Sequence, residues 1–75
     1  MNVAQLTTAF LQNKNQLKSF LLRLTASAED AEDIMQDTYI KAAEKIDTFR
    51  AEASLKTWIF TIATNLAKDN LRAKR

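Results

Sequence analysis

The chain has 75 residues and contains no cysteine, histidine, glycine or proline. These absences exclude disulfides, thiolate and histidine metal sites, histidine-based catalysis and glycine-rich phosphate loops. Hydrophobic residues make up 47% and charged residues 27%. We therefore expect one folded all-α domain over 1–75, without a membrane span, metal or cofactor, that binds partners and is not an enzyme. The first residues lack a basic segment followed by an apolar core, which predicts no signal peptide and a cytoplasmic location.

Charge is segregated along the chain. Residues 1–25 carry three cationic side chains and no acid, residues 26–49 carry two cations and seven acids, and residues 50–75 carry six cations and two acids. An acidic middle beside a basic end is typical of two faces that bind different partners. The alternative is the ordinary preference of helix starts for acids and of helix ends for bases.

Apolar residues recur at helical spacing over about 4–25, which predicts the first helix. A polar stretch over 12–15 interrupts this pattern and predicts a kink or break there. The residues expected to face the core are Leu6, Phe10, Leu17, Phe20, Leu21 and Leu24.

A second helix is predicted over about 28–46. Ser27 is its expected N-cap, with Asp30 three residues later in a capping pattern. The segment over about 47–53 has no periodicity and is expected to be a loop. The buried stripe of the second helix is expected to consist of Ala31, Ile34, Met35, Thr38, Ala42 and Ile46.

A third helix is predicted over about 54–72, with Ser54 as its N-cap. The three elements together predict a compact bundle of three main helices, the first of which is broken if the polar stretch ends it. We expect Trp58 to lie in the core. The full buried face of the third helix is expected to consist of Leu55, Trp58, Ile59, Ile62 and Leu66.

The third helix also carries a polar stripe away from its buried face. An ordinary solvated face favours strong helix formers, whereas threonine and asparagine lower helix propensity and add hydrogen-bonding groups. Hydroxyls, an amide and cations in one sector suit contact with phosphates and base edges. A plain solvated face is the alternative. The stripe consists of Thr57, Thr61, Thr64, Asn65, Lys68 and Arg72.

Two neighbouring segments add further candidates. Phe49 and Arg50, in the loop, could hold an unstacked base, although a loop phenylalanine more often packs into the core. The acidic face of the second helix suits docking of a basic partner, with a solvated face as the alternative. It offers no convincing metal or catalytic carboxylate site. This face consists of Glu29, Asp33, Gln36, Asp37, Lys41 and Glu44.

Segment 24–39, with the sequence LTASAEDAEDIMQDTY, resembles the second conserved region of bacterial RNA polymerase sigma factors of the extracytoplasmic-function subgroup. Three further segments resemble the continuation of that region in the same order and spacing. They are Phe49-Arg50, 53–60 (ASLKTWIF) and 62–67 (IATNLA). The resemblance covers about residues 10–75.

The resemblance implies an all-helical sigma region 2 domain that acts in transcription initiation. Its second helix would dock on the clamp helices of the polymerase beta-prime subunit through a D-x-x-Q-[DE] motif, which maps to Asp33, Gln36 and Asp37, with Tyr39 close by. The loop and third helix would recognise the promoter −10 element and hold the melted non-template strand, with Asn65 and the Phe49 loop at a flipped-out base. The residues implied to bind DNA are Phe49, Arg50, Lys56, Thr61, Thr64, Asn65, Lys68 and Arg72.

The chain departs from the family's pattern in two ways. Ala51 stands where the family often has glycine, and the family often has another glycine near Ala26. Because alanine adopts positive φ less readily, a recognition loop of different shape is expected. The family's second DNA-binding domain, which reads the −35 element, has no counterpart in these 75 residues, so we expect a domain taken from a longer protein. An anti-sigma protein would be a further partner, and the competing hypothesis is a helical protein-interaction module that does not bind DNA.

Overall fold

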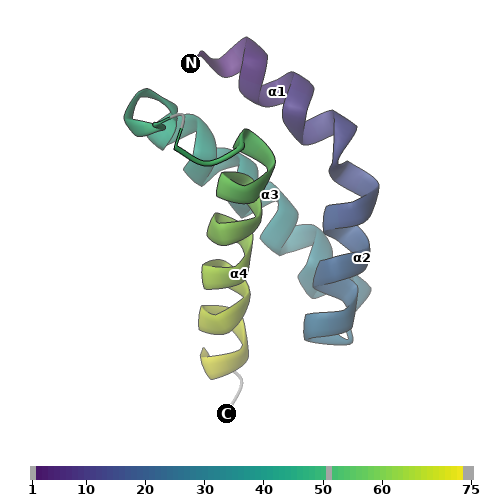
Figure 1. The fold of residues 1–75 in the computed structure, drawn as a ribbon. Helices are drawn as coiled ribbons and strands as arrows, with labels where there is room; N and C mark the ends of the chain where they lie inside the picture. The colour runs from purple at the N-terminus through teal and green to yellow at the C-terminus, as the bar shows by residue number, and fades with distance from the viewer. Residues whose placement is uncertain (1, 51, 74–75) are drawn as a thin grey trace.

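Four α-helices and one 3-10 turn form the part of the chain that the structure, a computed structural model, describes: residues 2–50 and 52–73. Within these residues there is no β-strand, which confirms the all-α prediction. The radius of gyration of 12.0 Å is close to the roughly 11 Å expected of a compact domain of this length. The elements are α1 (Val3–Gln12), α2 (Lys14–Thr25), α3 (Ala28–Lys45), η1 (Ile46–Thr48) and α4 (Leu55–Ala73) (Figure 1).

The predicted first helix is broken into α1 and α2 at Asn13, inside the polar stretch. The side-chain amide of Asn13 donates a hydrogen bond of 2.8 Å to the carbonyl of Ala9. Asparagine competes with the backbone for such carbonyls, which favours the end of a helix. The chain turns there and starts α2 in a new direction (Figure 1). The predicted break is confirmed.

The corner between α2 and α3 depends on one alanine in the left-handed conformation. Ala26 has φ 55° and ψ 27° and its backbone N–H donates to the carbonyl of Leu22 at 2.9 Å. This conformation costs an L-residue about 1–2 kcal/mol, a cost that glycine does not carry. Ser27 then caps α3 by accepting a hydrogen bond from the backbone N–H of Asp30, as predicted. Ala51 lies outside the described residues.

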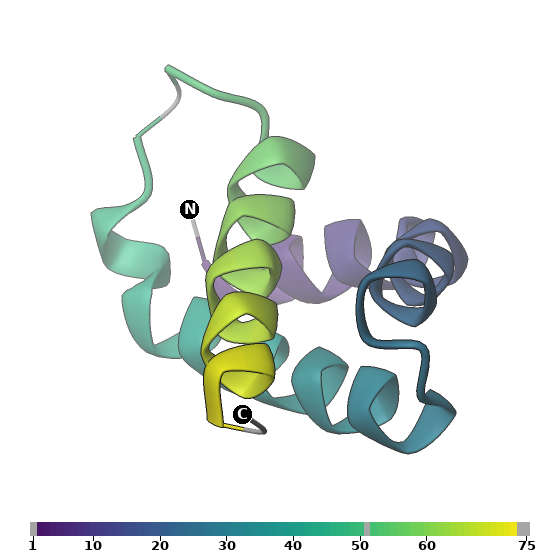
Figure 2. The same ribbon diagram turned by 90° about the horizontal axis from the view of Figure 1, so that it is seen from below.

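Helix α3 packs against both α2 and α4. Figure 1 shows α3 passing diagonally behind α4 and the lower part of α2, and Figure 2 shows the same three helices from below. Every residue predicted for the buried stripe of this helix is buried. The predicted helix end at 46 differs by one residue, because Ile46 starts the 3-10 turn.

The buried line of α4 differs from the prediction. Its fully buried residues are Ile59, Ala63 and Ala67. The four other residues predicted for this face, Leu55, Trp58, Ile62 and Leu66, are only half-buried and flank that line. Small alanine side chains let two helices approach closely, so the contact follows the alanines and the large side chains cover its edges.

Leu24 is a second departure from the predicted core, because its side chain is 39% exposed at the end of α2. The other residues predicted for the first helical segment are buried, except for Phe20, which packs against the core from its edge.

Candidate nucleic-acid interface

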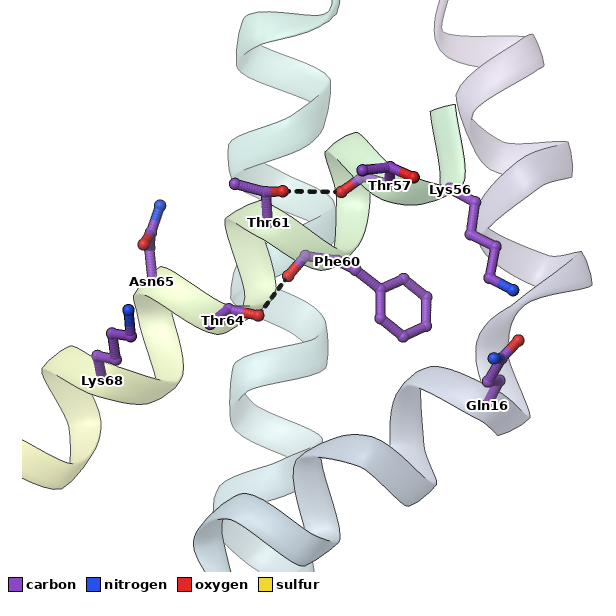
Figure 3. Close-up of a pocket in the computed structure, with 8 residues that line it drawn as sticks. All are labelled: Gln16, Lys56, Thr57, Phe60, Thr61, Thr64, Asn65 and Lys68. Atoms are coloured by element: carbon purple, nitrogen blue, oxygen red, sulfur yellow. Dashed lines mark hydrogen bonds between the residues drawn. The ribbon is translucent and has the colours of Figure 1, made fainter. Parts of the chain in front are cut away.

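An open groove of about 490 Å³ lies between α2 and α4. Seven of its lining residues come from α4 and one comes from α2 (Figure 3). Two lining residues are cations and none is an acid, so the groove offers a positive surface. The lining residues are Gln16, Lys56, Thr57, Phe60, Thr61, Thr64, Asn65 and Lys68.

The structure brings together five of the eight residues that the sequence implies bind DNA. They are Lys56, Thr61, Thr64, Asn65 and Lys68. The remaining three, Phe49, Arg50 and Arg72, do not line this groove.

Sequence reasoning missed Gln16 and Phe60 as lining residues. The aromatic Phe60 lies beside the polar stripe on α4, so helical spacing could have predicted that it lines the groove. No pattern in the sequence could have predicted Gln16, because its place in the groove depends on how α2 packs beside α4.

The threonine hydroxyls of the groove have different hydrogen-bonding roles. Thr61 donates its hydroxyl proton to the carbonyl of Thr57 at 2.9 Å, and Thr64 donates to the carbonyl of Phe60 at 2.7 Å (Figure 3). Their oxygens keep free lone pairs, so both present acceptors to the groove. Acceptors suit the amino groups of bases and do not suit phosphate oxygens.

Thr57 is the exception. Its oxygen accepts a hydrogen bond of 2.9 Å from the hydroxyl of Ser54, and the oxygen of Ser54 accepts one of 3.0 Å from the backbone N–H of Thr57. Ser54 is therefore the N-cap of α4, as predicted. The hydroxyl proton of Thr57 stays available, so this residue offers the groove a donor for an anionic oxygen.

The loop aromatic lies away from the groove. The rings of Phe49 and Trp58 meet edge to face, with centroids 5.2 Å apart. Both side chains are half-buried and pack against the core, as expected of a loop phenylalanine, and Trp58 lies at the core edge. The base contact of Phe49 stays a prediction. Arg50 is exposed, and Arg72 lies 3.9 Å from the carboxylate of Asp69.

The acidic face of α3 presents Asp33, Gln36 and Asp37 to solvent. Tyr39, predicted close by, is half-buried. Its hydroxyl lies 2.7 Å from that of Thr7 and its ring meets that of Phe10 edge to face, so it ties α3 to α1. Gln36 and Tyr39 line a second groove of about 400 Å³ between these helices, which Asp33 and Asp37 do not line. This groove consists of Phe10, Lys14, Glu32, Met35, Gln36, Tyr39 and Ile40.

Residues 2–50 and 52–73 contain neither a cluster of metal-ligating side chains nor a membrane-spanning helix. No three acidic side chains come together in this part of the chain in a way that could hold a metal ion. None of its helices is both long enough and apolar enough to cross a membrane.

The family model for sigma-70 region 2 matches residues 9–75. The chain is 36% identical over 59 residues to the ECF RNA polymerase sigma factor EcfG of Rhodopseudomonas palustris, covering 79% of this chain and 33% of that protein. It is 36% identical over 62 residues to the ECF RNA polymerase sigma factor SigW of Bacillus subtilis (83% and 33%), and 38% identical over 61 residues to the ECF RNA polymerase sigma-E factor of Haemophilus influenzae (81% and 32%). The chain thus spans about a third of the length of these relatives.

Proposed function

The chain belongs to the sigma-70 region 2 family, and on this premise we propose that it docks a transcription initiation factor on RNA polymerase and holds the melted promoter strand. Proteins of this family are initiation factors and not enzymes. The proposal assigns the two activities to different faces, and its site of action is the cytoplasm, where the polymerase works.

The groove between α2 and α4 carries the proposal for DNA. Lys56 and Lys68 supply positive charge for a phosphate backbone, and no acidic side chain lines the groove to oppose it. Thr61 and Asn65 offer hydrogen-bonding groups for base edges. We assign to this groove the non-template strand of the −10 element, with Asn65 as the residue that selects a base.

The acidic face of α3 carries the proposal for the polymerase. Asp33, Gln36 and Asp37 are exposed, so they can meet a basic helical surface such as that implied for the beta-prime subunit. Tyr39 supports this face by tying α3 to α1. An anti-sigma protein that covered both faces would block both activities.

Energetics decide what such a domain can do by itself. Opening five base-pair steps costs roughly 7 kcal/mol at about 1.4 kcal/mol per step. One captured, stacked base returns about 1–3 kcal/mol. A domain that holds one or two bases therefore cannot melt a promoter alone. It captures bases as they leave the stack while the polymerase holds the DNA, which shifts the population towards the open state.

Substitution Asn65→Ala in the polymerase-bound protein tests this assignment. We expect selectivity among −10 sequences to fall by about tenfold at one strand position, because alanine cannot hydrogen-bond to a base edge. Asn15→Ala is the matched control, since Asn15 is exposed on α2 and lines neither groove. Selectivity that is unchanged by Asn65→Ala would show that another residue reads the base.

A further inference from the structure

The outer side of α3 carries a straight line of exposed side chains, Asp33, Asp37, Ile40 and Glu44, which we call the α3 ridge. At about 100° per residue, these four positions fall within about 60° of one another around the helix axis. All four side chains are exposed, that of Ile40 to 55%. The α3 ridge therefore presents three carboxylates and one apolar side chain in a single row.

The α3 ridge and the groove between α2 and α4 carry opposite charges that are not neutralised within the chain. Among residues 2–50 and 52–73, the ion pairs join Lys18 to Glu32 and Arg72 to Asp69. The three acids of the α3 ridge and the two lysines that line the groove belong to neither pair. No residue of the α3 ridge lines the groove, so these two surfaces pair only between copies of the chain.

We propose that the α3 ridge of one copy of this chain docks in the groove between α2 and α4 of a second copy. The contact joins two different surfaces, so it is head to tail, and each added copy leaves one α3 ridge and one groove free. The docking itself does not depend on the proposed function. Its consequence does, because a docked copy covers a surface assigned to the DNA strand and a surface assigned to the polymerase.

The charges at the two ends match when the two helices run antiparallel. Along α4, Lys56 and Lys68 are about 18 Å apart at about 1.5 Å per residue. Along α3, Glu44 and Asp33 are about 16 Å apart on the same basis. With Glu44 of one copy against Lys56 of the second copy, Asp33 therefore lies within reach of Lys68. Each terminal carboxylate of the α3 ridge then meets an ammonium group.

The middle of the two surfaces matches in the same register. Ile40 and Phe60 each lie one helical turn inside the end of this register, so they face each other. Phe60 is half-buried and lines the groove, so contact with the exposed Ile40 removes apolar surface of both from water. Asp37 lies towards Asn65, whose side-chain amide donates hydrogen bonds that a carboxylate accepts. Thr57 supplies its free hydroxyl proton at the end that receives the last carboxylate.

The lysines of α3 itself do not oppose this docking. Lys41 and Lys45 stand to one side of the α3 ridge, where they line a pocket of about 190 Å³ against α4 of their own chain. The acids of the α3 ridge therefore form the surface that the second copy meets.

The association is weak and sensitive to salt. Exposed ion pairs contribute little individually, and one helix in an open groove buries less area than a stable complex does. At about 0.1 M salt, exposed charges more than about 10 Å apart are largely screened. Self-association therefore belongs to high protein concentration and low salt. A DNA strand or a polymerase that binds one of the two surfaces dissociates the copies.

Sedimentation equilibrium of the 75-residue chain tests this proposal, at protein concentrations up to about 1 mM and at low and high salt. Wild type should exceed the mass of a dimer at the highest concentrations in low salt and should be a monomer in high salt. Two variants with native helicity by circular dichroism each remove the charge of one surface. They are Lys56→Gln/Lys68→Gln in the groove and Asp33→Asn/Glu44→Gln on the α3 ridge. Each alone should self-associate at least about tenfold more weakly than wild type does.

A mixture of the two variants gives the sharpest outcome. It should form a heterodimer and grow no further, because only one charged α3 ridge and one charged groove remain in each pair. The wild-type net charge of +2 becomes 0 in the groove variant and +4 in the ridge variant, so net charge does not draw the two together. A mixture that does not pair, or wild type that is a monomer at every concentration, would overturn the proposal.

Two control variants change the net charge by the same amounts at exposed positions outside both surfaces. They are Lys14→Gln/Arg23→Gln and Asp47→Asn/Glu52→Gln, and both should self-associate as wild type does. Equal weakening in these controls would overturn the proposal.

A short single strand of −10 sequence separates this proposal from the proposed function. Added to associated wild type, it should return the chain to monomers, which supports both. If the variants behave as expected but the strand leaves the association intact, the docking stands and the assignment of the groove to DNA fails.

Discussion

The two grooves of this small bundle differ in their chemistry. The groove between α2 and α4, which we call the cationic groove, is lined by two lysines, three threonines, two amide side chains and Phe60. The groove between α1 and α3 is lined mainly by apolar and aromatic side chains, with one acid, Glu32, and one cation, Lys14 of α2. It adjoins the exposed carboxylates of Asp33 and Asp37.

This difference gives the two proposed partners separate surfaces on one 75-residue chain. α3 is the shared support: its buried stripe packs against α2 and α4, and its outer face carries the acids. The cationic groove is lined by α2 and α4, whereas the exposed acids lie on α3 away from its buried stripe. Substitutions of exposed residues on one face should therefore leave the other face intact, and the predictions below test that independence.

The largest effect is expected when the charge of the cationic groove is reversed. Lys56→Glu/Lys68→Glu should weaken single-strand binding at least about tenfold, because two attractive interactions with phosphates become repulsive. The slope of log affinity against log salt concentration should become shallower by about 0.7 for each phosphate that is no longer neutralised. Fluorescence anisotropy over a series of salt concentrations measures both quantities.

The control for this prediction is Lys14→Glu/Arg23→Glu, which changes the net charge equally but places it on α2 outside the cationic groove. Equally weakened binding in both double variants would mean that net charge alone attracts DNA. The cationic groove would then not be the DNA-binding surface.

Ala26→Gly should stabilise the fold without changing either groove. Glycine adopts the φ of 55° at this corner without the steric cost that alanine carries, so we expect a gain of about 1 kcal/mol. For a domain of this size that corresponds to a rise in Tm of about 4–8 °C. Thermal unfolding followed by circular dichroism measures it. Ala4→Gly, in the first turn of α1, should lower the Tm instead. A fall in both variants would contradict the left-handed conformation of Ala26.

A smaller effect is expected from the threonines, and it separates phosphate contacts from base contacts. Thr57→Val removes the free hydroxyl donor and should weaken binding of all strands about threefold, whatever their sequence. Thr61→Val removes an acceptor and should weaken only strands that place an amino-bearing base against it. Comparison of anisotropy titrations with matched strands tests this. The same dependence on sequence for both variants would contradict the assigned donor and acceptor roles.

Local signals in the sequence predicted most of the fold. Ser27 and Ser54 cap their helices through hydrogen bonds to residues three positions on, so these boundaries depend only on nearby sequence. The break at Asn13 is equally local. The polar stripe of α4 also predicted most of the cationic groove, because helical periodicity alone places these residues on one side.

The features that were missed depend on how helices pack against each other. The alanine line of α4 became the contact with the core because small side chains permit close approach, which the pattern of large apolar residues does not reveal. The contribution of Gln16 requires α2 to lie beside α4. The sequence also could not show that Phe49 packs against Trp58, because that contact joins the loop to α4.

The most direct test of two independent faces is binding of the chain to core RNA polymerase. Wild type is compared with Asp33→Ala/Gln36→Ala/Asp37→Ala, whose three positions are exposed and should not affect folding. The matched variant is Lys56→Glu/Lys68→Glu, in which the charge of the cationic groove is reversed. We predict that the triple variant binds the polymerase at least about a hundredfold more weakly than wild type does. The Lys56→Glu/Lys68→Glu variant should bind the polymerase as tightly as wild type does. Undiminished binding by the triple variant, or equally weakened binding in both variants, would contradict the account.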